Sequence, residues 1–366
     1  MRQWEDWDQQ LRLKLPSESP WIYAVLCLVT ALPVVFFLLQ WSTSNSYLEY
    51  QVDRPDRLDL GQQAKHTEAH AYEEVQSTTL RNLNYTDIQI RGSKIFPRCP
   101  ADGQYLQTDP ITPATPNDID RSVRAATKAQ EVWSATSFTQ RRQVLRTLLH
   151  YVLTHQDDIA TACCLDSGKT KIDASFGEVL VTAEKLTWTI KHGEAALESS
   201  RRPTNLLMCY KTNTVHYEPL GVVSACVSWN YPFHNLISLV ISALFSGNAI
   251  VVKPSEQTAW SSLYFTEIIK GALTACGHSP DLVQTVICLP DVADHLTSHP
   301  DIKHITFIGS RPIAHKVAAS ASRSLTALTI ELGGKDPAII LDDPRTISDL
   351  DSVASIILRG TFQSAG

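Results

Sequence analysis

The chain has 366 residues, of which 43% are hydrophobic and 19% charged. It is long enough for roughly two or three globular domains and too apolar for a disordered protein. The 32 basic and 38 acidic residues give a net charge of -6, so no overall positive field attracts a phosphate backbone and we expect no nucleic-acid binding. The 8 cysteines form no CxxC pair, so we expect reduced thiols, no disulfide framework and no metal site.

The N-terminal region contains a candidate transmembrane helix. Residues 21–39 carry no charge and approach the ~20 residues that cross a bilayer core, and Trp21 and Trp41 flank them as interfacial aromatics do. A cleaved signal peptide or a buried core helix is the alternative, but the apolar run exceeds a signal core and no cleavage site follows it. We therefore expect a polar tail over residues 1–20 and a membrane anchor in contact with lipid over residues 21–41.

Helical patterns begin after a polar stretch, residues 42–100, which we interpret as a stalk and a connecting segment. Asn117 and Thr139 are the predicted N-caps of the first two helices. A third helix is expected over residues 174–196. The spacing of the apolar residues predicts a buried face on each of the first two helices. The first is formed by Ile119, Val123, Ala126 and Trp133, and the second by Val144, Leu145, Leu148, Leu149 and Val152.

Short apolar runs alternate with helical patterns between residues 221 and 341. The predicted strands are 221–227, 249–252, 282–288, 304–308 and 328–332, and the predicted helices are 236–245, 259–276, a short one after Asp291, and 312–322. This alternation is typical of an α/β fold with a doubly wound parallel sheet covered on both faces. Ligands of such sheets bind beyond the carboxyl ends of the strands, so the loops there are the candidate site.

Two of these loops carry polar groups suited to a ligand. Asn230 follows the first strand, and its carboxamide could donate to a developing oxyanion, although a turn-forming role is the simpler explanation for an isolated Asn. Lys253 and Glu256 follow the second strand. They could hold the hydroxyls of a ribose, and the carboxylate would repel a 2′-phosphate, which favours NAD over NADP. An isolated pair of this kind is more often a solvated surface turn.

The loops after the last two strands complete the pattern. Gly309 permits a close ligand approach, and Ser310 precedes a predicted helix whose N-terminus could receive a pyrophosphate. Glu331, which two glycines follow, is a candidate general base. The G-x-G-x-x-G fingerprint is absent from the chain, which disfavours an ordinary Rossmann dehydrogenase. Each loop is weak evidence alone, but four at successive strand ends are strong.

With these loops in order, the chain resembles the aldehyde dehydrogenase superfamily over residues 100–366. The resemblance rests on SWNYP, KPSE, FIGS, ELGGK, the terminal Gly-x-Phe-x-x-x-Gly and the upstream DSGK. With its anchor the chain is similar to membrane-bound fungal members associated by name with meiotic sister-chromatid recombination. Where the family often has a second glycine, this chain has Ala314.

The resemblance implies an NAD-binding domain over residues 101–330, with a bridging hairpin for a homo-oligomer near residues 206–218, and the start of a catalytic domain over residues 331–366. It implies oxidation of an aldehyde to a carboxylic acid through a cysteine thioester. Asn230 would be the oxyanion donor and Glu331 the base for the deacylating water. The implied cofactor contacts are Trp229, Lys253, Glu256, Gly309 and Ser310.

The family's nucleophilic cysteine would stand at the third position beyond Gly366, so we expect these 366 residues to be inactive. Cys226 and Cys276 are better explained as core residues. The alternative is a non-catalytic, membrane-anchored nucleotide-binding or interaction protein, and the transcript beyond Gly366 would separate the two. Reduced thiols and a cytosolic cofactor favour a large domain on the cytosolic side of the endoplasmic reticulum membrane.

Overall fold

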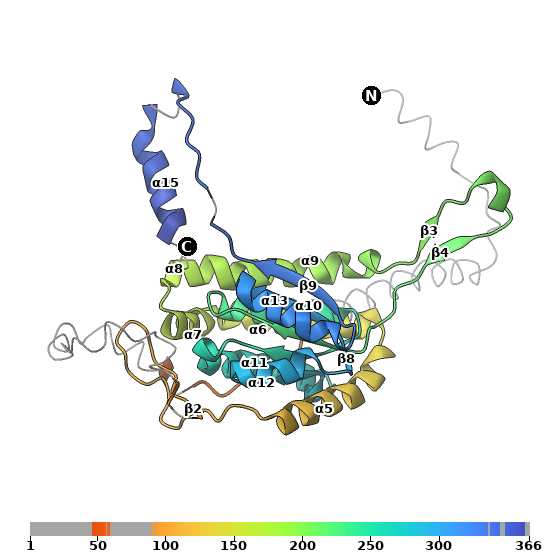
Figure 1. Ribbon diagram of the computed structural model, residues 1–366, viewed down its shortest axis with the longest axis horizontal. Coiled ribbons are helices and arrows are strands. Elements are labelled where there is room, and N and C mark those ends of the chain that lie inside the picture. Colours follow the sequence, from red (N-terminus) through yellow and green to blue (C-terminus); the bar gives the residue numbers. More distant parts are fainter. Residues whose placement is uncertain are drawn as a thin grey trace, which may run out of the picture. The chain divides into compact units, whose positions relative to one another are not determined.

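A five-stranded parallel sheet lies at the centre of the computed structural model (Figure 1), which describes residues 46–55, 57–58, 90–91, 93–335, 337–344 and 348–362. The strands are β5 (Val222–Cys226), β6 (Ala249–Lys253), β7 (Val283–Thr285), β8 (Ile302–Gly309) and β9 (Ala327–Leu332), and the sheet order is β7-β6-β5-β8-β9. Strand β5 and most of β6 are buried, which explains why both read as continuous apolar runs.

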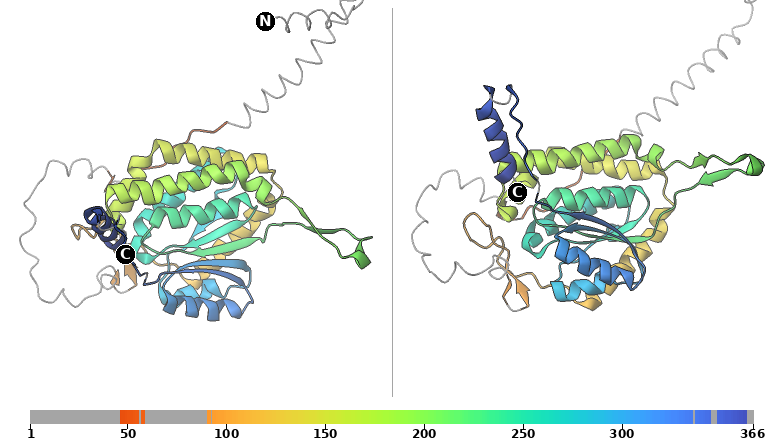
Figure 2. Two further views of the ribbon diagram at one scale, coloured as in Figure 1. Left: turned by 90° about the horizontal axis from the view of Figure 1, so that it is seen from above. Right: turned by 45° about the horizontal axis from the view of Figure 1, so that its top comes forward.

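Helices cover both faces of this sheet (Figure 2). On one face lie α10 (Pro232–Phe245) and α11 (Ala259–Ala275), and on the other lie α5 (Pro116–Ser134), α12 (Pro290–Thr297) and α13 (Arg311–Ser322). The chain moves outward from β5 to β7 and then returns to β8 and β9, so the helices before the return, α10 and α11, lie on one face and those after it, α12 and α13, lie on the other. The predicted doubly wound parallel sheet is confirmed, with its topological switch point between β5 and β8.

A further helical layer packs on α10 and α11. It consists of α6 (Phe138–Thr154), α7 (Gln156–Ser167) and α9 (Val181–Ala196), and α9 continues the short α8 (Lys171–Ala174) through a π-helical segment, η3 (Ser175–Leu180). The helix predicted over residues 174–196 is therefore observed, but it begins earlier and contains a π-turn.

The predicted caps of the first two helices are wrong by two residues each. Thr115, not Asn117, caps α5, and Ser137, not Thr139, caps α6. In both cases the cap and the residue three positions later form reciprocal hydrogen bonds, Thr115 with Asp118 and Ser137 with Gln140, and this capping box satisfies two otherwise unpaired N–H groups. The predicted inward residues are buried, except Leu149, which is half-buried.

Part of the predicted stalk packs on the folded unit. Tyr50 lies between α6 and α11, where its hydroxyl donates to the carbonyl of Ile268 at 2.8 Å and its ring stacks on Tyr151. Gly271 makes room for it, since a Cβ there would lie 2.6 Å from the Tyr50 ring. Ile95 is also fully buried; it belongs to β2 (Lys94–Ile95), which pairs antiparallel with β1 (Ile90–Arg91). The folded unit thus includes residues on the N-terminal side of residue 100.

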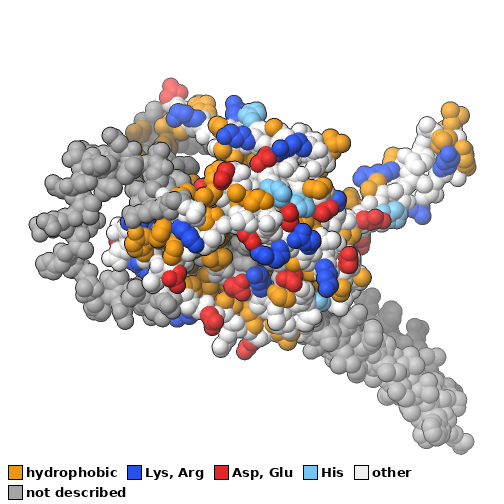
Figure 3. All heavy atoms as spheres, turned by 60° about the horizontal axis from the view of Figure 1, so that its bottom comes forward, with side chains coloured by type: hydrophobic (Ala, Val, Ile, Leu, Met, Phe, Trp, Pro, Cys, Tyr) orange, Lys and Arg blue, Asp and Glu red, His pale blue; other side chains and the backbone are white. Residues whose placement is uncertain are grey.

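A hairpin extends from the folded unit between α9 and β5 (Figure 2). Its strands are β3 (Ser200–Arg202) and β4 (Asn213–Val215), so it begins earlier than the predicted range 206–218. Its turn carries exposed apolar side chains, which gather at the tip in Figure 3; they are Leu206, Leu207, Met208 and Tyr210.

The C-terminal part of the described chain completes the central sheet and then forms a helix. Strand β9 runs through the predicted boundary between residues 330 and 331, and an exposed helix, α15 (Leu350–Phe362), follows.

Within the described part of the chain, no helix combines the length and the apolar character needed to cross a membrane. The predicted anchor over residues 21–41 and the polar tail over residues 1–20 lie outside the described residues.

Candidate functional site

A cavity of about 1010 Å³ opens at the carboxyl ends of β5, β6, β8 and β9. All seven residues singled out in the sequence line it, namely Trp229, Asn230, Lys253, Glu256, Gly309, Ser310 and Glu331. They come from the ends of four strands and the loops that follow, up to about 100 residues apart in the chain, and the parallel sheet brings these strand ends to one edge. The cavity therefore lies at the switch point, where the order of the strands reverses.

Lys253 and Glu256 form one wall of the cavity. Lys253 ends β6, and Glu256 begins a short 3₁₀ turn, η5 (Glu256–Thr258), whose cap is Ser255. The ammonium nitrogen of Lys253 lies 3.3 Å from Oε2 of Glu256, and the two side chains are 14% and 16% exposed. The pair is thus neither a solvated surface turn nor fully buried, and it can offer both a donor and an acceptor to hydroxyl groups.

Gly309 and Ser310 join β8 to α13 at the opposite wall. A Cβ on Gly309 would lie 2.7 Å from Cζ of Phe307, so glycine keeps this wall thin and lets the Phe307 ring pack beneath it. The side chain of Ser310, the N-cap of α13, makes no capping hydrogen bond. The first-turn N–H groups of this 12-residue helix therefore lack a side-chain acceptor, which suits an anion.

The side chain of Asn230 is oriented by its neighbours on the same loop. Ser228 donates its hydroxyl to Oδ1 of Asn230 at 2.7 Å, and Asn235, in the first turns of α10, donates to the Ser228 oxygen at 3.0 Å. Because Oδ1 accepts from Ser228, the NH₂ group is the part of the carboxamide left to donate into the cavity.

Glu331 lies on the edge strand β9, opposite Ile308 of β8 in the parallel register. Its side chain is exposed and lines the cavity. Strand β8 separates β9 from β5, so Glu331 and Asn230 approach the cavity from opposite sides of the end of β8. A carboxylate and a neutral amide donor thus flank the same space.

Sequence reasoning missed two buried charged residues beneath the Asn230 loop. Lys169 and Glu178 form an ion pair of 2.6 Å, with side chains only 3% and 0% exposed. Lys169 also donates to the backbone carbonyl of Asn230 at 2.7 Å. A signal for Lys169 was present, since it ends the DSGK motif, whereas Glu178 belongs to no motif that we identified.

The cysteines among the described residues do not provide a nucleophile at this cavity. Cys226 is the one that lines it, but burial raises the pKa of its thiol to about 11, so the thiolate is scarce near neutral pH. Cys276 is the C-cap of α11, where its thiol donates to Thr147 and burial raises its pKa. Cys226 is the core residue that the sequence predicted, whereas Cys276 is half-buried and packs against the core.

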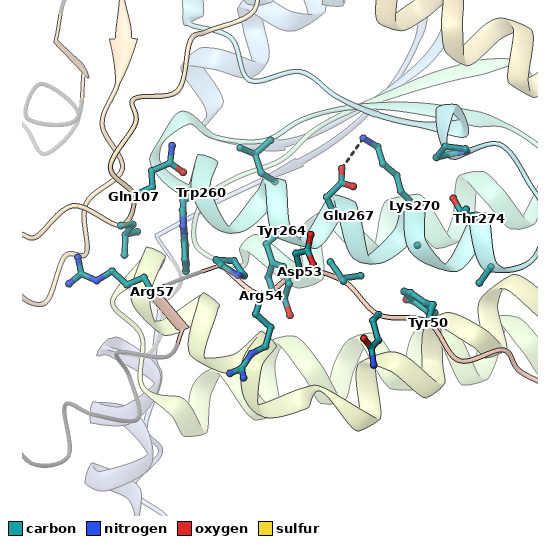
Figure 4. A pocket seen from close by; sticks show the side chains of 18 of the residues that line it. Tyr50, Asp53, Arg54, Arg57, Gln107, Trp260, Tyr264, Glu267, Lys270 and Thr274 are labelled. Carbon is teal, nitrogen blue, oxygen red and sulfur yellow. Dashed lines mark hydrogen bonds and ion pairs between the residues drawn. The ribbon is translucent and has the colours of Figure 1, made fainter.

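A second, larger groove lies away from the strand-end loops (Figure 4). It has a volume of about 1850 Å³ and is bounded by residues 49–55 and 57, the loop 104–108 and α11. Glu267 and Lys270 of α11 pair with each other on its wall at 3.0 Å. None of the seven predicted site residues is among its described lining residues, so the smaller cavity is the candidate functional site.

Comparison with known proteins identifies the family. The model of the aldehyde dehydrogenase family matches residues 90–366. An aldehyde dehydrogenase-like protein of Schizosaccharomyces pombe is 54% identical over 268 residues, covering 73% of this chain and 50% of that protein. A similarly described protein of Saccharomyces cerevisiae is 55% identical over 276 residues, covering 73% and 42%. This chain belongs to the aldehyde dehydrogenase family, and it spans about half the length of these curated relatives.

Solved structures share the fold. PnpE in complex with nicotinamide adenine dinucleotide is 27% identical with a TM-score of 0.67, and the match covers 75% of this chain and 53% of PnpE. A succinate-semialdehyde dehydrogenase from Burkholderia pseudomallei is 27% identical with a TM-score of 0.66, covering 74% and 54%. An NADP-dependent enzyme of E. coli is 27% identical with a TM-score of 0.67, covering 75% and 55%.

Proposed function

We propose that the cavity at the switch point binds NAD and that this chain supplies the cofactor contacts, the oxyanion donor and the general base of an aldehyde-oxidising site. The observation that carries the proposal is the convergence of seven residues from the ends of four strands, and from the loops that follow, on one cavity. The NAD complex among the structural neighbours supports a nicotinamide cofactor.

The lining of the cavity fits a dinucleotide. Lys253 and Glu256 would hold the hydroxyls of the adenine ribose, since one donates and the other accepts. The pyrophosphate would lie at the N-terminus of α13, where Ser310 leaves the first-turn N–H groups without a side-chain acceptor and Gly309 adds no side chain. When bound, NAD supplies a two-electron acceptor.

We propose NAD rather than NADP because of Glu256. Its carboxylate lines the cavity beside Lys253, and a negative charge near the ribose disfavours a 2′-phosphate. The structural neighbours include both an NAD complex and an NADP-dependent enzyme, so the preference rests on this residue and not on the fold.

The aldehyde chemistry would use Asn230 and Glu331. The amide NH₂ of Asn230 can donate to the carbonyl oxygen of an aldehyde as it gains negative charge, and Ser228 holds the amide in that orientation. Glu331 can take a proton from water on the other side of the cavity. The described cysteines add no reactive thiolate here, so we propose that these 366 residues bind the cofactor without turning over an aldehyde.

Calorimetric titration of the purified chain with NAD and NADP tests the proposal. We expect saturable binding of one NAD per chain, weaker binding of NADP, and no NADH formation with aliphatic or aromatic aldehydes. Absence of NAD binding by a folded chain would overturn the cofactor assignment. Turnover abolished by Cys226→Ser would overturn the statement about the described thiols.

The uncharged run over residues 21–41 suggests where the protein is located in the cell. We propose that residues 21–41 anchor the chain in the endoplasmic reticulum membrane with the large domain in the cytosol; the uncharged run in the sequence supports this. Release by alkaline carbonate, or protease protection of the domain in sealed microsomes, would contradict it.

We also propose a homo-oligomer formed through the β3–β4 hairpin, whose apolar tip is exposed. A monomeric mass in light scattering would contradict this proposal.

A further inference from the structure

We propose that Lys169 and Glu178 are positioning residues that hold the Asn230 loop from beneath, and that this inference deepens the proposed function on which it rests. Lys169 lies in the turn after α7, and Glu178 lies in the π-helical segment η3. Neither residue lines the cavity. They act through the backbone carbonyl of Asn230, the residue that we assign to the oxyanion, and through backbone N–H groups of the helix turn that follows it.

The ammonium group of Lys169 has partners in three directions. It donates to Oε1 of Glu178 at 2.6 Å and to the carbonyl of Asn230 at 2.7 Å, and it lies 4.2 Å from the ring centroid of Tyr231. Two hydrogen bonds and a cation–π contact thus hold the ammonium in position. The carbonyl of Asn230 is thereby tied to a charge that is only 3% exposed.

The carboxylate of Glu178 holds the next part of the loop. Its Oε2 accepts from the backbone N–H groups of Phe233 at 3.0 Å and His234 at 2.8 Å. These belong to the first turn of α10, whose own N-cap, Tyr231, provides no side-chain acceptor. Glu178 thus caps α10 from another helix, and a negative charge at that end also interacts favourably with the helix dipole.

The π-helical segment gives this arrangement a second, independent feature. Gly177 precedes Glu178, and a Cβ on Gly177 would lie 2.9 Å from Cε1 of Tyr231. The Tyr231 ring is therefore held between this glycine and the ammonium of Lys169. A π-turn in an otherwise α-helical stretch is frequently associated with a functional site. Here it brings a glycine and a carboxylate to the same loop.

Hydrogen exchange of the full chain, purified in mild detergent without any cofactor, tests the inference. Lys169→Met should make exchange about tenfold faster in peptides that cover residues 228–236, as expected for the loss of a hydrogen bond to a charged group. Exchange in peptides of β6 and α13 should stay unchanged. The matched control is Lys171→Met, since Lys171 lies two residues away in an exposed ion pair with Asp157.

Two further variants keep the test decisive if Lys169→Met does not fold, because that change leaves a buried unpaired carboxylate. The pair Lys169→Met with Glu178→Gln removes both charges at nearly constant volume, and Gly177→Ala changes no charge but displaces the Tyr231 ring. Both should accelerate exchange in residues 228–236. Unchanged exchange there in these folded variants, or equal acceleration throughout the sheet, would overturn the inference.

Titration with NAD separates this inference from the proposed function. If the wild-type chain binds NAD, the variants should bind it at least about threefold more weakly. This ratio corresponds to the partial loss of one hydrogen bond. The control Lys171→Met should bind NAD as the wild type does. Local exchange that changes as expected in a chain that does not bind NAD would support the positioning role and refute the cofactor assignment. NAD binding with unchanged local exchange would support the cofactor assignment and refute the positioning role.

Discussion

Lys253 and Glu256 form an ion pair at the rim of the candidate cofactor cavity, with 3.3 Å between Nζ and Oε2. The pair is three residues apart in the chain and spans the end of β6 and the start of η5. The turn of the main chain between the two residues therefore fixes how both side chains are oriented toward a ligand in the cavity. Removal of the carboxylate should change the choice of ligand more than the fold.

Glu256→Gln should reduce the preference for NAD over NADP by about tenfold, because loss of one charge a few ångströms from a partly solvated 2′-phosphate is worth about 1–2 kcal/mol. Dissociation constants of both cofactors, measured by calorimetry, check this. Glu267→Gln is the control, since Glu267 pairs with Lys270 at the same spacing but lines the other groove. An unchanged ratio in Glu256→Gln would remove this carboxylate from the ribose site.

Gly309→Ala should weaken NAD binding and lower the free energy of unfolding by about 1–3 kcal/mol, since the new methyl group displaces the Phe307 ring that packs beneath the cavity. Gly333→Ala is the matched control, because Gly333 lines the same cavity and a Cβ there meets no atom within 4 Å. Calorimetric titration and denaturant midpoints measure the two effects. Equal effects of the two substitutions would contradict the packing argument.

The sequence allowed prediction of the sheet and of the cavity for a simple physical reason. Buried parallel strands need unbroken apolar runs, and the polar residues that interrupt them mark the carboxyl edge. The caps of α5 and α6 were missed because Asn117 and Thr139 have cap-forming side chains, whereas the reciprocal bonds of Thr115 and Ser137 were overlooked. Glu178 could not be predicted, since its role depends on contacts with N–H groups 55 and 56 residues away.

Asp166 should make stability depend on pH. Burial raises the pKa of this carboxyl to about 7 from 3.8, although Ser261 donates its backbone N–H to one oxygen. Because the folded-state pKa lies above the unfolded value, the protonated form is the one that favours folding. Its contribution is complete below pH 3.8 and is lost as the pH rises through about 7, by about 4 kcal/mol in total.

Asp166→Asn keeps an acceptor for Ser261 and removes the titration. Relative to this variant, the wild-type chain should therefore lose stability as the pH rises from 5 to 8, which denaturant midpoints at each pH would show. Asp281→Asn, at an exposed carboxylate, is the control. Parallel pH profiles for the wild type and Asp166→Asn would contradict the account of this buried group.

Tyr50→Phe should lower the free energy of unfolding by about 1 kcal/mol, because it removes the hydrogen bond to Ile268 but keeps the stacked ring. Tyr47→Phe is the control, since Tyr47 is 47% exposed. Figure 4 shows Tyr50 beside α11 in the larger groove. If Tyr50→Phe matched the wild type in urea unfolding, the segment 46–55 would contribute nothing through this contact.

The central claim is that the cavity at the switch point, and not the larger groove, holds NAD. Hydrogen exchange of the wild-type chain with and without saturating NAD tests it most directly. NAD should protect amides in three peptides, which cover residues 228–236, 253–258 and 309–314, and should leave residues 46–55 and 104–108 unchanged. Protection confined to the two groove segments, or no protection in a folded chain, would contradict the account.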